Sequence, residues 1–161
     1  MKKIFNFPII LILLFSVFQC RGYEPIFSTS NMQFEIAEYS LDGNKRIAKQ
    51  IYSNLNNLTK SNDEGDVKSI YLEIKVIKEK TPTSKNSAGK ILEYRINLNT
   101  DVLVLDYLTK NTLMNQNFNS SFSYKVQDQY SETIKMEDKA LNNLINKTYK
   151  DLLLKLTEKI H

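Results

Sequence analysis

The only cysteine of the chain stands at a position that suggests the chemistry its thiol could undergo. Cys20 comes just after an uncharged apolar run, Phe7 to Phe18, where the sequence turns polar. Secreted bacterial lipoproteins are acylated on a cysteine at this point, and several acyl chains, at about 0.8 kcal/mol per buried methylene, would hold a small domain on a bilayer. Val17 fits the aliphatic start of an acylation motif, whereas Phe18 and Gln19 are not small residues. Cys20 is therefore the predicted lipid attachment site; the alternative is a small apolar residue that ends a signal peptide.

The segment before Cys20 has the layout of a secretory signal peptide. Lys2 and Lys3 form a positively charged start, and the apolar run that follows is about 12 residues long and contains Pro8. A membrane-spanning helix needs about 20 apolar residues, so a retained transmembrane anchor is the weaker alternative. We predict residues 1–19 as the signal peptide. Its removal lowers the net charge from +4 to +2, because it takes away Lys2 and Lys3 and no acidic residue.

Four lysines surround the second predicted hairpin. The only acidic residue between the first and the last of them is Glu79. Ammonium groups bind phosphates as point charges, so these side chains are candidate contacts to a phosphorylated ligand. The alternative is that they keep a hairpin soluble and protect the edge of a sheet. The four residues are Lys78, Lys80, Lys85 and Lys90.

The rest of the composition carries little sign of catalysis. The only histidine is His161, the last residue, and one cysteine permits no internal disulfide and too few ligands for a structural zinc site. No phosphate-binding loop, metalloprotease motif or serine hydrolase motif occurs. The acidic residues of the 60–67 loop are explained by a solvated turn. The helix dipole explains the acidic residues near the start of the last helix, which are Glu132, Glu137 and Asp138. We predict no enzyme, no metal and no cofactor, and a dispersed charge of +4 does not indicate a nucleic-acid partner.

Length and hydrophobic periodicity predict one α+β domain over residues 34–161, preceded by a tether over residues 20–33. Period-two alternation marks four strands, and a period of 3.6 residues marks two helices. The expected architecture is a two-layer sandwich of order β-α-β-β-β-α, with both helices on one face of a four-stranded mixed sheet. The elements are a strand from Phe34 to the turn at Asp42-Gly43, a helix from Asn44 to Thr59, strands at Ile70–Ile77, Ile91–Asp106 and Phe118–Val126, and a helix from Ser131 to the C-terminus.

The connections and the longest strand carry finer expectations. Residues 81–90 are predicted as a loop because they are rich in Pro, Gly and Ser, and residues 107–117 as a second loop with Leu113 and Met114 as minor core residues. The strand at Ile91–Asp106 is longer than the usual 3–10 residues, so a bulge or bend is expected.

The last helix is expected to bury one broad stripe. Ser131 is the predicted N-cap, and Ile134 is counted among the inward-facing apolar residues. Met136 and Leu154 fall on the polar side of this helix. They are either scattered surface apolar residues, which are common, or part of a patch that docks on a larger protein.

The residues after Cys20 and the order of the elements resemble a known family. The segment GYEPIF, residues 22–27, matches the pattern of Gly, aromatic, any residue, Pro, aliphatic and aromatic that follows the lipidated cysteine in the lipopolysaccharide-assembly lipoprotein family LptE, in its alphaproteobacterial form. In this chain Arg21 stands between the cysteine and the motif. The segment from Leu72 to Leu98 is also similar to that family, and the resemblance covers nearly the whole mature chain.

The resemblance implies a non-enzymatic protein with two helices on a four-stranded sheet. Members of the family plug the lumen of the outer-membrane β-barrel LptD, help it assemble and help pass lipopolysaccharide to the outer leaflet. The implied location is the periplasmic side of the outer membrane, held by a lipid anchor, because the residue after Cys20 is not Asp. Lipopolysaccharide is anionic, so the hairpin lysines become candidate lipopolysaccharide contacts. The alternative is a periplasmic auxiliary lipoprotein of an ABC-type lipid transporter, and a hydrolase is a distant third.

Overall fold

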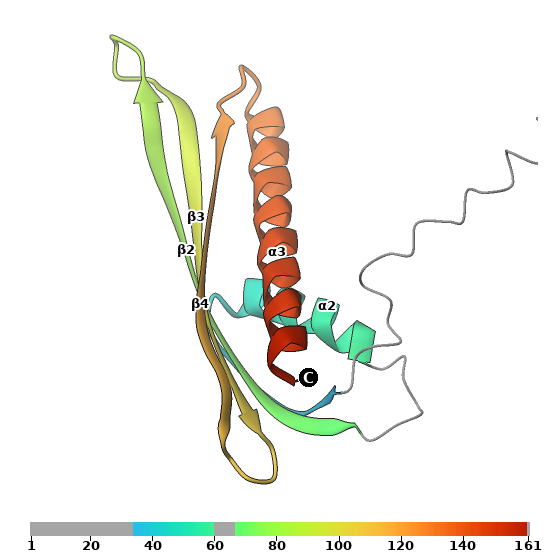
Figure 1. Ribbon diagram of the computed structural model, residues 1–161. Coiled ribbons are helices and arrows are strands. Elements are labelled where there is room, and N and C mark those ends of the chain that lie inside the picture. Colours follow the sequence, from blue (N-terminus) through green and yellow to red (C-terminus); the bar gives the residue numbers. More distant parts are fainter. Residues whose placement is uncertain (1–33, 60–66, 161) are drawn as a thin grey trace, which may run out of the picture.

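The computed structural model describes residues 34–59 and 67–160 (Figure 1). The predicted signal peptide (1–19), the tether (20–33) and Cys20 lie outside the described residues. The elements follow the expected order, and the first and third strands have the predicted limits. In chain order they are β1 (Phe34–Gly43), α2 (Lys45–Thr59), β2 (Lys68–Lys85), β3 (Ile91–Asp106), β4 (Thr112–Lys125) and α3 (Tyr130–Ile160).

The four strands form one mixed sheet in the order β1-β2-β3-β4. β1 is parallel to β2, whereas the β2–β3 and β3–β4 pairs are antiparallel. A parallel pair needs a crossover connection, and α2 provides it. Both helices lie on the same side of the sheet (Figure 1). The predicted α+β architecture is therefore confirmed.

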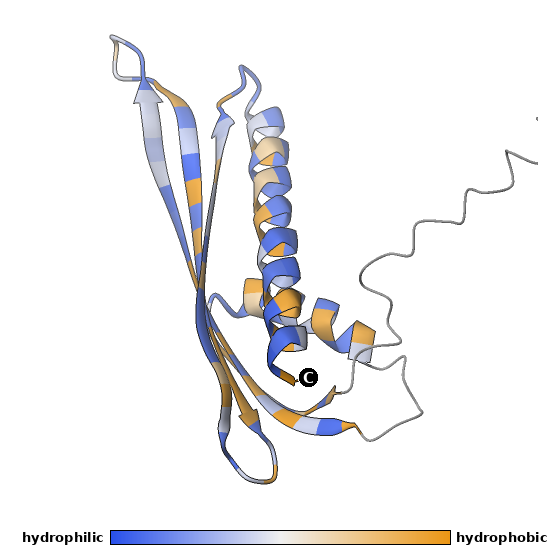
Figure 2. Ribbon diagram, in the orientation of Figure 1, coloured by the Kyte–Doolittle hydropathy of each residue, from blue (hydrophilic) through white to orange (hydrophobic). Residues whose placement is uncertain are grey.

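The core lies between the sheet and the two helices. Four alternate residues of β2, from Ile70 to Val76, are fully buried, and three of the residues opposite them on β3 are buried as well. The register brings Leu72 against Val104 and Ile74 against Val102. Figure 2 shows hydrophobic and hydrophilic bands alternating along the strands. From α2 the fully buried residues Ile47, Ile51 and Leu55 follow at intervals of four. Each such side chain contributes about 1.5–3 kcal/mol by leaving water.

Two strands are longer than their hydrophobic pattern predicts. Residues 81–85, predicted as loop, continue β2, and Pro82 pairs with Tyr94. The register shifts on either side of Ser84, so the strand absorbs its proline at an irregularity. Residues 112–117, also predicted as loop, belong to β4. Their pairing with β3 makes them strand although their hydrophobic alternation is weak. The bulge expected for the long strand β3 is present as a register shift between Val104 and Leu105.

The last helix is a single uninterrupted element of 31 residues. The predicted cap is wrong, because the carbonyl of Gln129 accepts the first amide bonds and the hydroxyl of Thr133 accepts the Gln127 amide. The inward placement of Ile134 is wrong too. That side chain is exposed, whereas the preceding Thr133 is buried and its hydroxyl is bonded to the Gln127 amide, so the buried stripe of the helix begins at Thr133. Met114 is buried and Leu113 packs against the core, as predicted.

Candidate functional site

The structure separates the four hairpin lysines into two pairs. Lys78 lies opposite Leu98 and Lys80 opposite Ile96, both of which are buried core residues. Because side chains alternate along a strand, these two lysines continue the inward face of β2 beyond Val76. They therefore extend toward the layer of α3 and do not lie at the tip of the hairpin.

Glu137 of α3 binds both inward-facing lysines. Its Oε1 accepts a hydrogen bond from Lys78 Nζ at 3.1 Å, and its Oε2 accepts one from Lys80 Nζ at 2.5 Å. The phenolic hydroxyl of Tyr124 on β4 donates to Oε2 at 2.9 Å. The Glu137 side chain is 16% exposed, against 22% for Lys78 and 34% for Lys80. We call these four residues, together with Tyr94, the Glu137 cluster.

Two tyrosines complete the surroundings of Lys80. Its Nζ lies 4.4 Å from the ring centroid of Tyr94 and 5.7 Å from that of Tyr124, and the two rings are stacked at 6.0 Å. A cation over aromatic faces gains about 0.5–1 kcal/mol at a partly exposed site. The cluster thus joins β2, β3, β4 and α3 at the end of the sheet that carries the β2–β3 hairpin.

The electrostatics of the Glu137 cluster keep its members charged. Partial burial raises the pKa of Glu137, but hydrogen bonds from Lys80, Tyr124 and Lys78 outweigh it and lower the pKa from the usual 4.5 to about 2. Burial acts to lower the pKa of Lys80, but the hydrogen bond to Glu137 outweighs burial and raises the pKa above its usual value. A general acid or base works best with a pKa near the operating pH. Glu137 and Lys80 instead serve as a fixed ion pair.

Sequence reasoning missed Glu137 as a partner of the lysines. It lies 59 residues from Lys78 and 57 from Lys80, so no local pattern connects them. Its position near the start of a helix already had an explanation in the helix dipole. Glu137 thus adds a partner from a distant part of the chain to Glu79, the only acidic residue between the lysines in the sequence.

Lys85 and Lys90 flank the turn of the β2–β3 hairpin. The side-chain oxygen of Asn86 accepts hydrogen bonds from the amides of Ala88 and Lys90, and the Asn86 amide donates to the Lys90 carbonyl. Both lysine side chains are exposed, and within the described part of the chain neither forms an ion pair. Of the four candidate contacts, Lys85 and Lys90 are therefore the two whose ammonium groups form no ion pair with another described residue.

The face of the sheet opposite the helices is polar and carries more acids than bases. Asn117 lies midway along the edge strand β4, and its amide donates to the side chains of Asn99 at 2.5 Å and Asp101 at 2.7 Å. By the register of the four strands, the regularly paired part of this face carries seven acids and three bases. They are Glu35, Glu38, Asp42, Glu73, Glu79, Glu93, Asp101, Lys75, Arg95 and Lys125.

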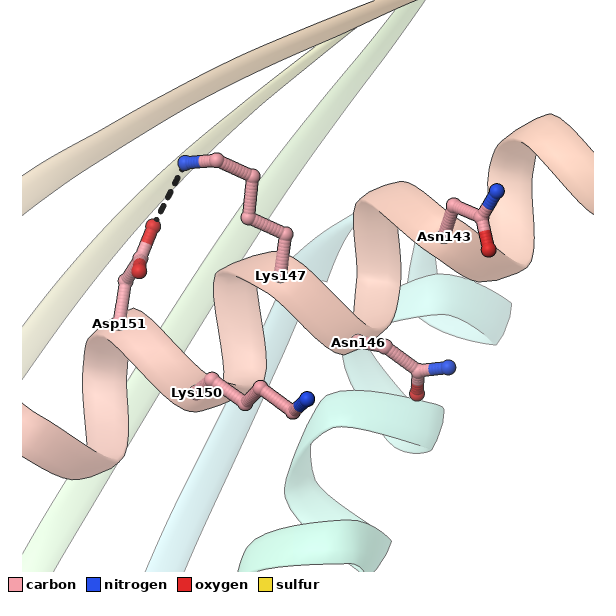
Figure 3. Close-up of a pocket in the computed structure, with 5 residues that line it drawn as sticks. All are labelled: Asn143, Asn146, Lys147, Lys150 and Asp151. Atoms are coloured by element: carbon pink, nitrogen blue, oxygen red, sulfur yellow. Dashed lines mark hydrogen bonds and ion pairs between the residues drawn. The ribbon is translucent and has the colours of Figure 1, made fainter.

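A polar hollow of about 400 Å³ lies on α3 (Figure 3). It is lined by Asn143, Asn146, Lys147, Lys150 and Asp151, and the Lys147–Asp151 ion pair of 2.9 Å occupies part of its wall. An open depression lined by amides and charges does not offer an apolar surface for an acyl chain.

The described ranges contain neither a group of metal-ligating side chains nor a helix fit to cross a membrane. Across residues 34–59 and 67–160, no three His, Cys, Asp or Glu side chains gather as a metal site. Within the same two ranges, no helix combines the length and the apolar character needed to cross a bilayer.

The fold is shared with solved bacterial structures, although no protein-family model and no curated protein matches the sequence. Rare lipoprotein B from Shewanella oneidensis aligns over 75% of this chain and 94% of its own, with a TM-score of 0.54 and 15% identity. An uncharacterized lipoprotein B from Nitrosomonas europaea aligns over 82% and 88%, with a TM-score of 0.54 and 14% identity. The minor lipoprotein from Acinetobacter baumannii aligns over 78% and 93%, with a TM-score of 0.52 and 15% identity. The chain therefore has the fold of these three proteins.

Proposed function

We propose that this protein is a non-enzymatic outer-membrane lipoprotein, anchored through Cys20, that plugs the LptD barrel and assists lipopolysaccharide transport. The observation that carries the proposal is the polar, Asn-rich face of the sheet that the helices leave uncovered, with Asn117 and its amide contacts. The lumen of a large outer-membrane barrel is polar, so a polar face can lie against it. The names of the proteins with the same fold agree with a lipoprotein.

The filled core supports this proposal over the alternative of an auxiliary lipoprotein for an ABC-type lipid transporter. A protein that carries lipid in a groove needs a large apolar cavity. Here 23 apolar side chains of the sheet and both helices form one buried cluster. The hollow on α3, in contrast, is lined by amides and charges.

Co-purification tests the proposed partner. The full chain, expressed with its own signal peptide and purified in mild detergent, is expected to bring a roughly stoichiometric outer-membrane barrel. Labelled palmitate tests the anchor. Wild-type protein is expected to incorporate the label, whereas the Cys20→Ala variant should take up none and should leave the membrane fraction. Recovery of an inner-membrane ATPase complex in place of a barrel would favour the alternative.

The exposed lysines are expected to contribute to lipopolysaccharide binding. Replacing Lys85 and Lys90 with Ser should weaken binding of purified lipopolysaccharide about twofold to thirtyfold, because two exposed ammonium groups each contribute about 0.2–1 kcal/mol. The matched control is the double change Lys135→Ser and Lys139→Ser on the exposed side of α3, which removes the same charge. Equal binding by both double variants, measured at low salt, would contradict the assignment. The change of all four hairpin lysines to Ser extends the test to Lys78 and Lys80.

A further inference from the structure

The turn between β3 and β4 presents an apolar side chain to solvent. Leu108 is 84% exposed, more than any other large apolar side chain in the described residues. The β3–β4 turn, which carries Leu108, lies at the lower end of the sheet in Figure 1. Tyr107 precedes Leu108, and the Nζ of Lys110 lies 4.3 Å from the centroid of the Tyr107 ring. An aromatic ring, an aliphatic tip and a lysine are the side chains that favour a membrane interface.

The backbone of this turn is held in one shape. The carboxylate of Asp106 accepts the amides of Leu108 at 3.1 Å and Thr109 at 2.9 Å. The amides of Tyr107 and Lys110 donate to the carbonyls of Ser69 and Asp106. The bond from the Thr109 amide, aided by Lys68, holds the pKa of Asp106 below its usual value. Leu108 is thus kept outside the core by a fixed turn, and its exposure does not require the fold to open.

The same end of the sheet is where the chain enters the domain. Phe34, the first residue of β1, pairs with Lys68, and the neighbouring Ser69 accepts the Tyr107 amide. Cys20 and Phe34 are 14 positions apart in the sequence, so the chain that joins them spans at most about 50 Å. An anchor at Cys20 therefore keeps this end of the domain within about 50 Å of the bilayer.

From these observations we infer that the Tyr107-Leu108 tip inserts into the leaflet that holds the lipid anchor and orients the domain on it. The inference rests on the proposed acylation of Cys20. Leu108 enters the acyl boundary, Tyr107 stays at the headgroup level, and Lys110 extends toward the lipid phosphates. The opposite end of the sheet, with the β2–β3 hairpin and the Glu137 cluster, then points away from this leaflet.

The chain contains no tryptophan, so one introduced tryptophan reports on its own surroundings. The test variant is Leu108→Trp, and the matched control is Tyr130→Trp, because Tyr130 is 79% exposed and begins α3 at the opposite end. Both full chains are purified from membranes and reconstituted on vesicles of phosphatidylethanolamine and phosphatidylglycerol, with or without brominated acyl chains. Leu108→Trp should show a blue-shifted emission maximum and lose most of its fluorescence to brominated lipid. Tyr130→Trp should show neither effect.

Flotation of the same vesicles separates failure of the inference from failure of the anchor. Wild-type protein that floats, with no quenching of Leu108→Trp or equal quenching of both variants, overturns insertion and leaves the anchor in place. Wild-type protein that does not float overturns both. An emission shift of Leu108→Trp that needs added barrel protein and is absent on vesicles also overturns the inference, because the tip then docks on protein.

Discussion

Replacement of Gly43 by Ala is expected to lower the free energy of unfolding by about 3 kcal/mol, because the alanine would be strained in its backbone conformation and would also clash with a neighbouring strand. Gly43 has a φ of +68°, in the left-handed region that disfavours residues with a Cβ. A Cβ built there would overlap the backbone carbonyl of Val76. That carbonyl also accepts the amide of Asn44 at 2.7 Å, so it cannot move away without losing the bond that leads into α2.

Gly89 provides the matched control for this change. It has a φ of +82°, but a Cβ there would meet no heavy atom within 4 Å. Gly89→Ala should therefore cost only the conformational strain, about 1 kcal/mol. Urea unfolding followed by circular dichroism measures both variants. Equal losses at the two glycines would show that the contact with Val76 contributes nothing.

Replacement of Glu137 by Gln is the second change with a large expected effect. The substitution keeps the size of the side chain but removes the charge that binds Lys78 and Lys80. Stability at neutral pH should fall by about 1–3 kcal/mol, since the carboxylate is largely buried while solvent screens the one-third exposed Lys80. Asp138→Asn on the next residue of α3, which is exposed, is the control and should change little.

The pH dependence of the Glu137 variant gives a second measurement. The pKa of Glu137 is lowered in the folded state, from 4.5 to about 2, so the unfolded chain takes up its proton first as the pH falls. The stabilisation is complete above about pH 4.5 and disappears as the pH approaches 2. Unfolding curves of wild type and Glu137→Gln should therefore differ most at neutral pH and converge in acid. A difference that is the same at every pH would contradict the ion-pair explanation.

The strand limits show how far hydrophobic alternation predicts a fold. β3 is predicted over its full length, Ile91–Asp106, because alternation is regular through most of it. Residues 81–85 carry a proline and little apolar character, yet they are strand, because β3 supplies hydrogen-bond partners opposite them. Pairing within the β2–β3 hairpin therefore extends the strand beyond its hydrophobic pattern.

Side-chain roles depended more strongly on tertiary structure than the elements did. The inward face of α3 could be predicted in its second half, where leucines mark it, but not near Ile134, where the buried residue is the polar Thr133. Alternation could have placed Lys78 and Lys80 on the inward face, had the strand been taken past Ile77. Their partner could not be found in this way, because the position of Glu137 depends on how α3 packs.

By itself, the sequence determined the order of the elements, the sidedness of the sheet and the position of Cys20, because local periodicity and apolar runs encode these directly. Only the tertiary structure decided which of the four hairpin lysines form an ion pair. Lys78 and Lys80 are bound to Glu137, whereas Lys85 and Lys90 remain at the turn. It also decided that Leu108 lies at the end where the chain enters the domain. The physical reason is that both arrangements arise from strand register and helix packing, which join residues far apart in the chain.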